Sequence, residues 1–332
     1  MSAAGTKEVL DGLISPQPKA THLGFMPGND FIAAADVVLS ETGDLPVIPI
    51  LPQRGIRGQI EASTMRLLPE LPIEIGPRSW RLSARPHIVT HRLWDDQQRD
   101  FDQLEEAWGT LHAVGIAVLG PLSLATRIEL ANGHRAISDP GAVNDINEIF
   151  IGNLQEKFTY LHRIFGAQPH VIIQEPELDA IMTGSIKATT DFDHIHPMRN
   201  ATERLHHTVA ALSMSATCHM FSPLASLKTI SAHVSIVSPH DYLSVKDKDN
   251  LAQLLAQKKQ LGIQIAGLTK PRESAVFLAQ LWDELGFPRT NLLHHIIYPR
   301  WQLDQFNLLE AAQVLAHAQK IAEILEKDVG DL

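Results

Sequence analysis

The sequence predicts an α/β protein folded as a single (β/α)8 barrel. Short apolar runs alternate with longer segments of helical period from one end of the chain to the other. Runs such as 170–173 and 262–267 are almost continuously apolar, as expected for parallel strands that are buried on both faces. Roughly eight such runs, with no Gly-rich linker between them, favour one closed barrel over two doubly wound halves.

The predicted elements follow from these two periods. The strands are the apolar runs at 20–25, 45–50, 115–120, 170–176, 211–218, 233–237, 262–267 and 294–299. The helices are the segments at 31–41, 98–112, 143–165, 248–260, 272–285 and 308–327. Within 143–165, for example, Ile146, Phe150 and Leu154 recur at helical spacing and form one apolar stripe.

The domain organisation has two parts, an N-terminal extension at 1–19 and the barrel at 20–327. Residues 51–95, which are rich in Pro, Arg and Gly, predict an elaborated loop region after the second strand. Long loops at the carboxyl face of a barrel usually carry function, so we expect this region to lie near the site.

Composition excludes several classes of protein. The chain has 332 residues and a formal net charge of −10, which argues against a nucleic-acid partner. The single cysteine, the lack of a signal-peptide pattern and the lack of an apolar run of about 18 residues predict a soluble cytoplasmic protein without a membrane span. No Gly-rich phosphate-binding motif follows a strand, so a nucleotide cofactor gets no support. The oligomeric state stays open.

Chemistry in a barrel belongs at the carboxyl ends of its strands. Glu175, in the stretch QEPE, ends the fourth predicted strand and could bind an amine, ligate a metal or act as a base. Its alternative role is structural, as a carboxylate paired with an arginine or a backbone amide. Gly24 and Gly28 could bring backbone amides to an anionic group, or could simply form the first turn.

The stretch TCHMFSP holds the only cysteine of the chain, Cys218, followed by His219. The pair is either part of a metal site or part of the core. Because neighbours on a strand point to opposite faces, only one of the two can face the barrel mouth. A second polar cluster at 191–197 could bind a divalent metal, but a polar loop that caps the next helix is the favoured interpretation.

Several short motifs recur in a known order. They are GFMPG at 24–28, LGPLS at 119–123, QEP at 174–176 and then His219. In this order the chain resembles the catalytic barrel of cobalamin-independent methionine synthase and its short single-barrel relatives. The resemblance implies a (β/α)8 barrel that moves a methyl group from a folate or corrinoid donor to homocysteine or a related small thiol. It also implies an amino-acid-like ligand and a zinc ion held by His, Glu and two Cys.

Carried onto this chain, the resemblance implies substrate-binding positions at Gly24, Phe25, Ser123, Gln174 and Glu175, and a zinc ligand at His219. Phe25 stands where the family has serine, and Gln174 stands where it has aspartate. At most one of the four zinc ligands has a counterpart, and a rearranged site would need Cys218, Glu175, His240 and His295.

Three functions therefore stay open. The chain is a methyltransferase of this kind, a catalytically degenerate barrel with a ligand-binding or regulatory role, or an enzyme of the same superfamily with another substrate.

Overall fold

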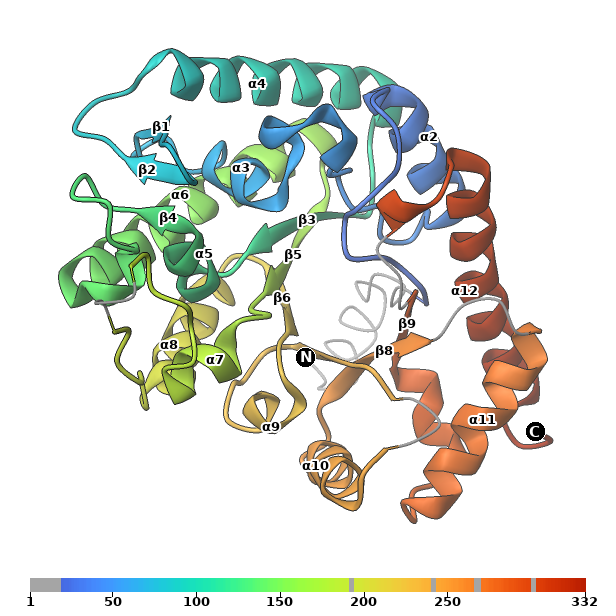
Figure 1. Cartoon of the computed structure of the whole chain (residues 1–332). Helices are drawn as coiled ribbons and strands as arrows, with labels where there is room; N and C mark the ends of the chain where they lie inside the picture. The colour runs from blue at the N-terminus through green and yellow to red at the C-terminus, as the bar shows by residue number, and fades with distance from the viewer. Residues whose placement is uncertain (1–18, 191–193, 240–242, 266–269, 300–302) are drawn as a thin grey trace, which may run out of the picture.

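The computed structural model describes residues 19–190, 194–239, 243–265, 270–299 and 303–332. Its centre is a curled sheet of six parallel strands in the order β3-β5-β6-β7-β8-β9, which Figure 1 shows with helices on its outside. The strands are β3 (Ala113–Leu119), β5 (Gln168–Gln174), β6 (Thr217–Phe221), β7 (Val234–Val237), β8 (Gln260–Ile265) and β9 (Ile296–Pro299). The prediction of an α/β fold with a buried parallel sheet is confirmed.

Two extended segments, 20–26 and 45–50, lie at the edges of this sheet. The first contacts β9, the second contacts β3, and the two segments contact each other. The parallel bridges are Ala20 with Ile297, Val47 with Gly115, and Phe25 with Ile50. Backbone hydrogen bonds accompany the bridges, such as the 2.9 Å bond from the Met26 amide to the Ile50 carbonyl. Both edge strands of the sheet therefore have a further backbone partner.

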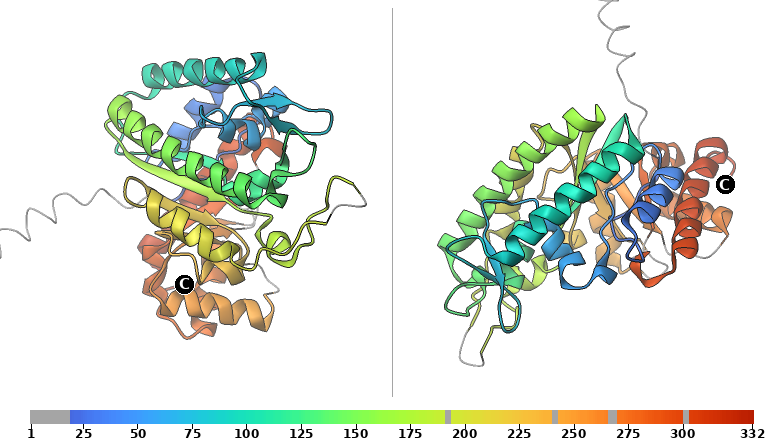
Figure 2. Two further views of the ribbon diagram at one scale, coloured as in Figure 1. Left: turned by 90° about the vertical axis from the view of Figure 1, so that its left-hand side faces the viewer. Right: turned by 90° about the horizontal axis from the view of Figure 1, so that it is seen from above.

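The long helices pack on the outer face of the sheet. They are α2 (Phe31–Glu41), α4 (Ile88–Trp108), α6 (Pro140–Phe165), α8 (Ala201–Leu212), α10 (Val245–Ala256), α11 (Pro271–Glu284) and α12 (Leu308–Asp328). Figure 2 shows α4 and α6 side by side, where Phe101 stacks on Tyr160 with 5.7 Å between ring centroids. In α6 the predicted stripe, including Phe150 and Leu154, is buried.

Side-chain caps fix the starts of several helices. The Asp139 carboxylate accepts from the Gly141 and Ala142 amides where α6 begins, and Pro140 stands at the first helical position. At α12, Asn307 and Glu310 form a reciprocal capping box.

The elaborated region after residue 50 forms a small structure of its own. It contains η1 (Pro52–Arg54), η2 (Ile56–Gly58), α3 (Ile60–Met65), β1 (Ile73–Ile75) and β2 (Trp80–Leu82). Strand β2 lies between β1 and β4 (Ile128–Glu129) in a three-stranded sheet. The remaining short elements are α5 (Pro121–Arg127), η3 (Ala136–Ser138), α7 (Leu178–Thr183), α9 (Leu224–Leu227), η4 (Arg289–His294) and η5 (Leu303–Gln305).

Two predicted elements were misplaced along the chain. The apolar run at 211–218 is not one strand, because its first residues complete the buried face of α8, with Val209 and Leu212 inside, and β6 begins only at Thr217. Helix α4 begins at Ile88, ahead of the predicted start at residue 98. Within the described ranges, no helix is both long and apolar enough to cross a membrane.

Candidate functional site

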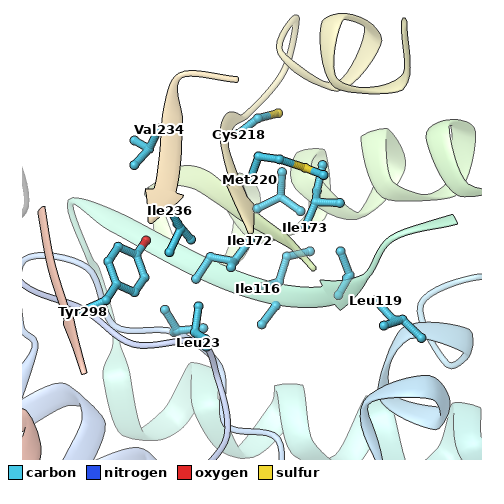
Figure 3. Close-up of a cluster of buried hydrophobic side chains, with 14 of the residues drawn as sticks. Leu23, Ile116, Leu119, Ile172, Ile173, Cys218, Met220, Val234, Ile236 and Tyr298 are labelled. Atoms are coloured by element: carbon cyan, nitrogen blue, oxygen red, sulfur yellow. The ribbon is translucent and has the colours of Figure 1, made fainter. Parts of the chain in front are cut away.

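A chain of three buried polar side chains crosses the interior of the curled sheet. His219, on β6, lies with Nε2 2.8 Å from His170 Nδ1 on the neighbouring strand β5. Its other ring nitrogen, Nδ1, lies 2.7 Å from the Tyr298 hydroxyl. Strands β7 and β8 separate β6 from β9, so the second contact spans the interior. Figure 3 shows Tyr298 reaching from β9 toward Ile236 and Ile172.

A glycine in β8 makes room for the tyrosine ring. A Cβ atom at Gly262 would lie 2.7 Å from Tyr298 Cε2 and 2.9 Å from Ile236 Cγ1. Any larger residue at this position would push the ring away from His219. Gly262, the first glycine of the apolar run GIQIAG, is therefore required by the packing of the interior.

Burial keeps the three groups uncharged near neutral pH. Burial lowers the pKa of His170 to about 4, and the nearby His233 adds to the effect. Burial, together with His170 and His233, holds the pKa of His219 well below its ordinary value, and burial raises the pKa of Tyr298.

The hydrogen-bond partners of Tyr298, His219 and His170 indicate which atoms carry the protons between them. The Tyr298 hydroxyl is hydrogen-bonded to His219 Nδ1, and its buried O–H has an acceptor when it donates to this nitrogen. His219 Nε2–H then donates to His170 Nδ1. Both nitrogens of His219 are thus engaged within the protein.

Of the rearranged zinc site, the described residues Cys218, Glu175 and His295 do not gather around His219. Cys218 points to the outer face, where Sγ lies 3.8 Å from the Val209 carbonyl oxygen of α8, and in Figure 3 its sulfur points away from Tyr298. Burial raises the pKa of this thiol to about 11, the opposite of what a zinc-bound thiolate needs. His295 accepts from the Leu261 amide.

These residues therefore do not fit the zinc ion that the resemblance implies. No group of three or more His, Cys, Asp or Glu in the described part of the chain is arranged to hold a metal. His240 lies outside the described residues, as do 191–193 of the second candidate cluster. In that cluster His194 and His196 are exposed.

Glu175 connects β5 to the start of α5. Its carboxylate accepts hydrogen bonds from the Leu122 amide, at 3.0 Å, and the Ser123 amide, at 2.7 Å. A Cβ at Gly120 would lie 2.2 Å from its Oε1, so this glycine is required for the close approach. Burial raises the pKa of Glu175 to about 7, although the hydrogen bonds oppose the rise. This is the structural role that the sequence left open for a strand-end carboxylate.

The other predicted substrate positions lie around the same end of the sheet. Gln174 Nε2 donates to the Leu23 carbonyl, 2.9 Å away, which places it next to Gly24. The Ser123 hydroxyl accepts from the Glu177 amide. Phe25 is buried and bridged to Ile50. The structure thus brings Gly24 near Gln174 and Ser123 near Glu175, while His219 is hydrogen-bonded to His170 and Tyr298.

The amides expected to hold an anion already have acceptors inside the protein. The Gly24 amide donates to His22 Nδ1 at 3.1 Å, and the Gly28 amide donates to Gln53 Oε1 at 3.1 Å. An anion would have to displace these acceptors to reach the Gly24 and Gly28 amides. Anion binding by these two amides therefore stays a prediction.

Sequence reasoning missed His170 and Tyr298 as partners of His219. His170 stands four residues before Gln174, so strand alternation places both on the same face. Strand alternation could therefore have placed His170 on the same face as Gln174. The contact between His219 of β6 and Tyr298 of β9, however, depends on the curvature of the sheet.

Comparison with known proteins gives the class of fold. No family model and no curated protein matches the chain. The chain is similar to a solved B12-independent methionine synthase from Shewanella sp. W3-18-1 in complex with selenomethionine. That likeness has a TM-score of 0.60 and 11% identity, and it covers 95% of this chain and 99% of the other. A methyltransferase from Methanosarcina mazei is similar with a TM-score of 0.52 and 11% identity, over 93% of this chain and 95% of the other. At such identities the likeness shows a barrel fold of this kind.

Proposed function

We propose that the chain is a complete (β/α)8 barrel, with segments 20–26 and 45–50 as its first two strands. Their backbone bonds to β9, to each other and to β3 support this proposal, since together they would close the ring. The carboxyl ends of all the strands would then surround one mouth, which is where barrel proteins bind their ligands.

For this barrel we propose a ligand-binding role, with a small amino-acid-like molecule at the mouth and no zinc–thiolate chemistry. The observation that carries the proposal is the pairing of His219 with both His170 and Tyr298. A histidine whose two nitrogens are engaged inside the protein has no lone pair to offer a metal. The solved Shewanella structure is a complex with selenomethionine, which supports an amino acid as the ligand class.

The interior side chains at the strand ends suit such a ligand. Gln174 of β5 is fixed by the Leu23 carbonyl, and Gln264 of β8 is hydrogen-bonded to Ser238. Neutral amides of this kind can accept from an ammonium group and donate to a carboxylate. We therefore expect the ligand to be zwitterionic, with Gln174 as one of its contacts.

Titration of the protein with methionine and homocysteine, followed by the melting temperature and by calorimetry, tests the proposal. We expect saturable binding by the native protein and binding about tenfold weaker in Gln174→Ala, because one hydrogen bond to a charged group is lost. Gln168→Ala is the matched control, since Gln168 is exposed at the other end of the same strand. Absence of binding, or an equal loss in both variants, would contradict the proposal.

A second candidate is methyl transfer to a small thiol, which the similarity to a methionine synthase and a methyltransferase favours. Incubation with homocysteine and a methylated folate or corrinoid, with and without added zinc, tests it. Formation of methionine would establish this second candidate and overturn the ligand-binding role.

The predicted cytoplasmic location and the lack of a nucleic-acid partner remain proposals that rest on composition and charge.

A further inference from the structure

A cavity of about 470 Å³ lies between the start of α2, the loop after residue 50, α3 and α4. Its polar lining is dominated by arginine. The lining includes Arg54, Arg57, Arg66 and Arg99, together with Asp96 and Asp100. Gln53, at the edge of the cavity, bonds the Gly28 amide and the Asp304 carbonyl, which places the cavity beside the loops at the carboxyl ends of the strands.

Two carboxylates are shared among the four guanidinium groups. Asp100 accepts from Arg54 at 3.1 Å and from Arg66 at 2.8 Å. Asp96 accepts from Arg57 and, at 2.8 Å, from Arg99. Four positive groups facing two negative groups leave two positive charges in the cavity, although the chain as a whole carries −10. A local positive region in an acidic protein attracts anions selectively.

The inner half of the cluster is buried. The Asp100 side chain is 3% exposed and that of Arg66 is 10% exposed, whereas Arg54, the second arginine on Asp100, is 33% exposed. Arg66 Nε is also buried without a hydrogen-bond partner among the described residues. One carboxylate thus faces two guanidinium groups in a partly buried place, and a bound anion would balance the remaining positive charge.

Two contacts fix the position of the Arg54 side chain at the cavity. Its Nε donates to the Asn29 carbonyl at 3.0 Å, and its Cζ lies 5.3 Å from the centre of the Phe31 ring. Each guanidinium has five N–H donors in a planar fork, and the cluster uses only some of them. The outer pair, Arg57 and Arg99, is 41% and 60% exposed and can reach a ligand that enters from solvent.

We propose that this cavity binds a small polyanion, one that carries two or more phosphate or carboxylate groups. The volume exceeds what one inorganic ion fills, and arginine forks match the oxygen geometry of both groups. Gln174 and Gln264, which are proposed to suit the amino acid at the mouth, do not line this cavity, so either proposal can fail without the other.

Calorimetric titration of the whole chain with pyrophosphate and, separately, with citrate tests the proposal at constant ionic strength. We expect saturable binding of at least one of the two, and the comparison decides between phosphate and carboxylate groups. Arg57→Gln and Arg99→Gln are each expected to weaken binding about tenfold, because each removes a charge-assisted hydrogen bond.

The matched control is Arg92→Gln, on the same helix as Arg99 but exposed and outside the cavity lining. It makes the same change in net charge and should bind as the native protein does. Failure of both anions to bind, or an equal weakening in Arg92→Gln and Arg99→Gln, would overturn the proposal. Unchanged melting temperatures without ligand would show that the variants are folded.

Discussion

At the scale of the residue, neighbouring side chains have different roles because successive residues of a strand face opposite sides. Gln174 faces the interior of the sheet, whereas the next residue, Glu175, faces α5 and joins it to β5. Cys218 and His219 divide in the same way on β6. Strand alternation predicted this division for Cys218 and His219. The identity of the partners was not predictable, because they come from distant segments.

Glu175→Gln should destabilise the protein by about 1 to 3 kcal/mol. An amide can accept from only one of the Leu122 and Ser123 amides, and its own N–H₂ group would face the other donor. Urea unfolding measures the change. Glu105→Gln, at an exposed site on α4, is the control and should lie within about 0.5 kcal/mol of the native protein. Equal stability of the two variants would show that the Glu175 carboxylate is not held in this way.

At the scale of the element, the bounds of α2 were easier to predict than the start of β6. The segment 31–41 was predicted with the bounds that α2 has, because Asp30 caps its start and its apolar face is regular. The predicted start of β6 was too early, because the apolar residues at the end of α8 come shortly before the strand in the sequence. A turn at 213–215 separates the two elements, and the apolar pattern of 211–218 does not show it.

Gly262→Ala tests the packing of β8 against the tyrosine. The added methyl group would lie 2.7 Å from the ring of Tyr298, so the ring must move or the strand must shift. We expect a loss of about 1 to 3 kcal/mol in unfolding free energy. Gly152→Ala in α6 is the control, because a Cβ there meets no neighbour, and it should stabilise slightly. A neutral Gly262→Ala would contradict the interior position of Tyr298.

At the scale of the whole molecule, buried histidines should set the response to acid. Burial lowers the pKa of His22 to about 3 and those of His170 and His295 to about 4, and His219 is also lowered. Between pH 6.5 and about 4 the unfolded chain protonates these imidazoles while the folded chain does not. Stability that is fully present above pH 6.5 is therefore lost as the pH falls.

Glu175 acts in the opposite direction. Its raised pKa of about 7 means that the folded state keeps a proton that the unfolded state releases above about pH 4.5, which adds stability on acidification. More buried histidines than carboxyls are shifted, so near pH 5 the unfolded state binds more protons than the folded state. We expect the unfolding free energy to fall steeply from pH 6.5 to pH 4.5 in urea titrations. A flat or rising profile would contradict the burial of these histidines.

The sequence predicted the class of the fold, the parallel sheet and most of its helices, because these depend on hydrophobic period. It also indicated where the site residues lie along the strands. The His170–His219–Tyr298 chain and the arginine cavity could not be predicted, since each joins segments that only the folded chain brings together.

We propose that the barrel binds an amino-acid-like ligand without a zinc ion. Calorimetric titration of methionine into the protein, before and after exhaustive treatment with a chelator, tests it most directly. We expect saturable binding with the same affinity in both samples. Loss of binding after chelation, with recovery on addition of zinc, would contradict it.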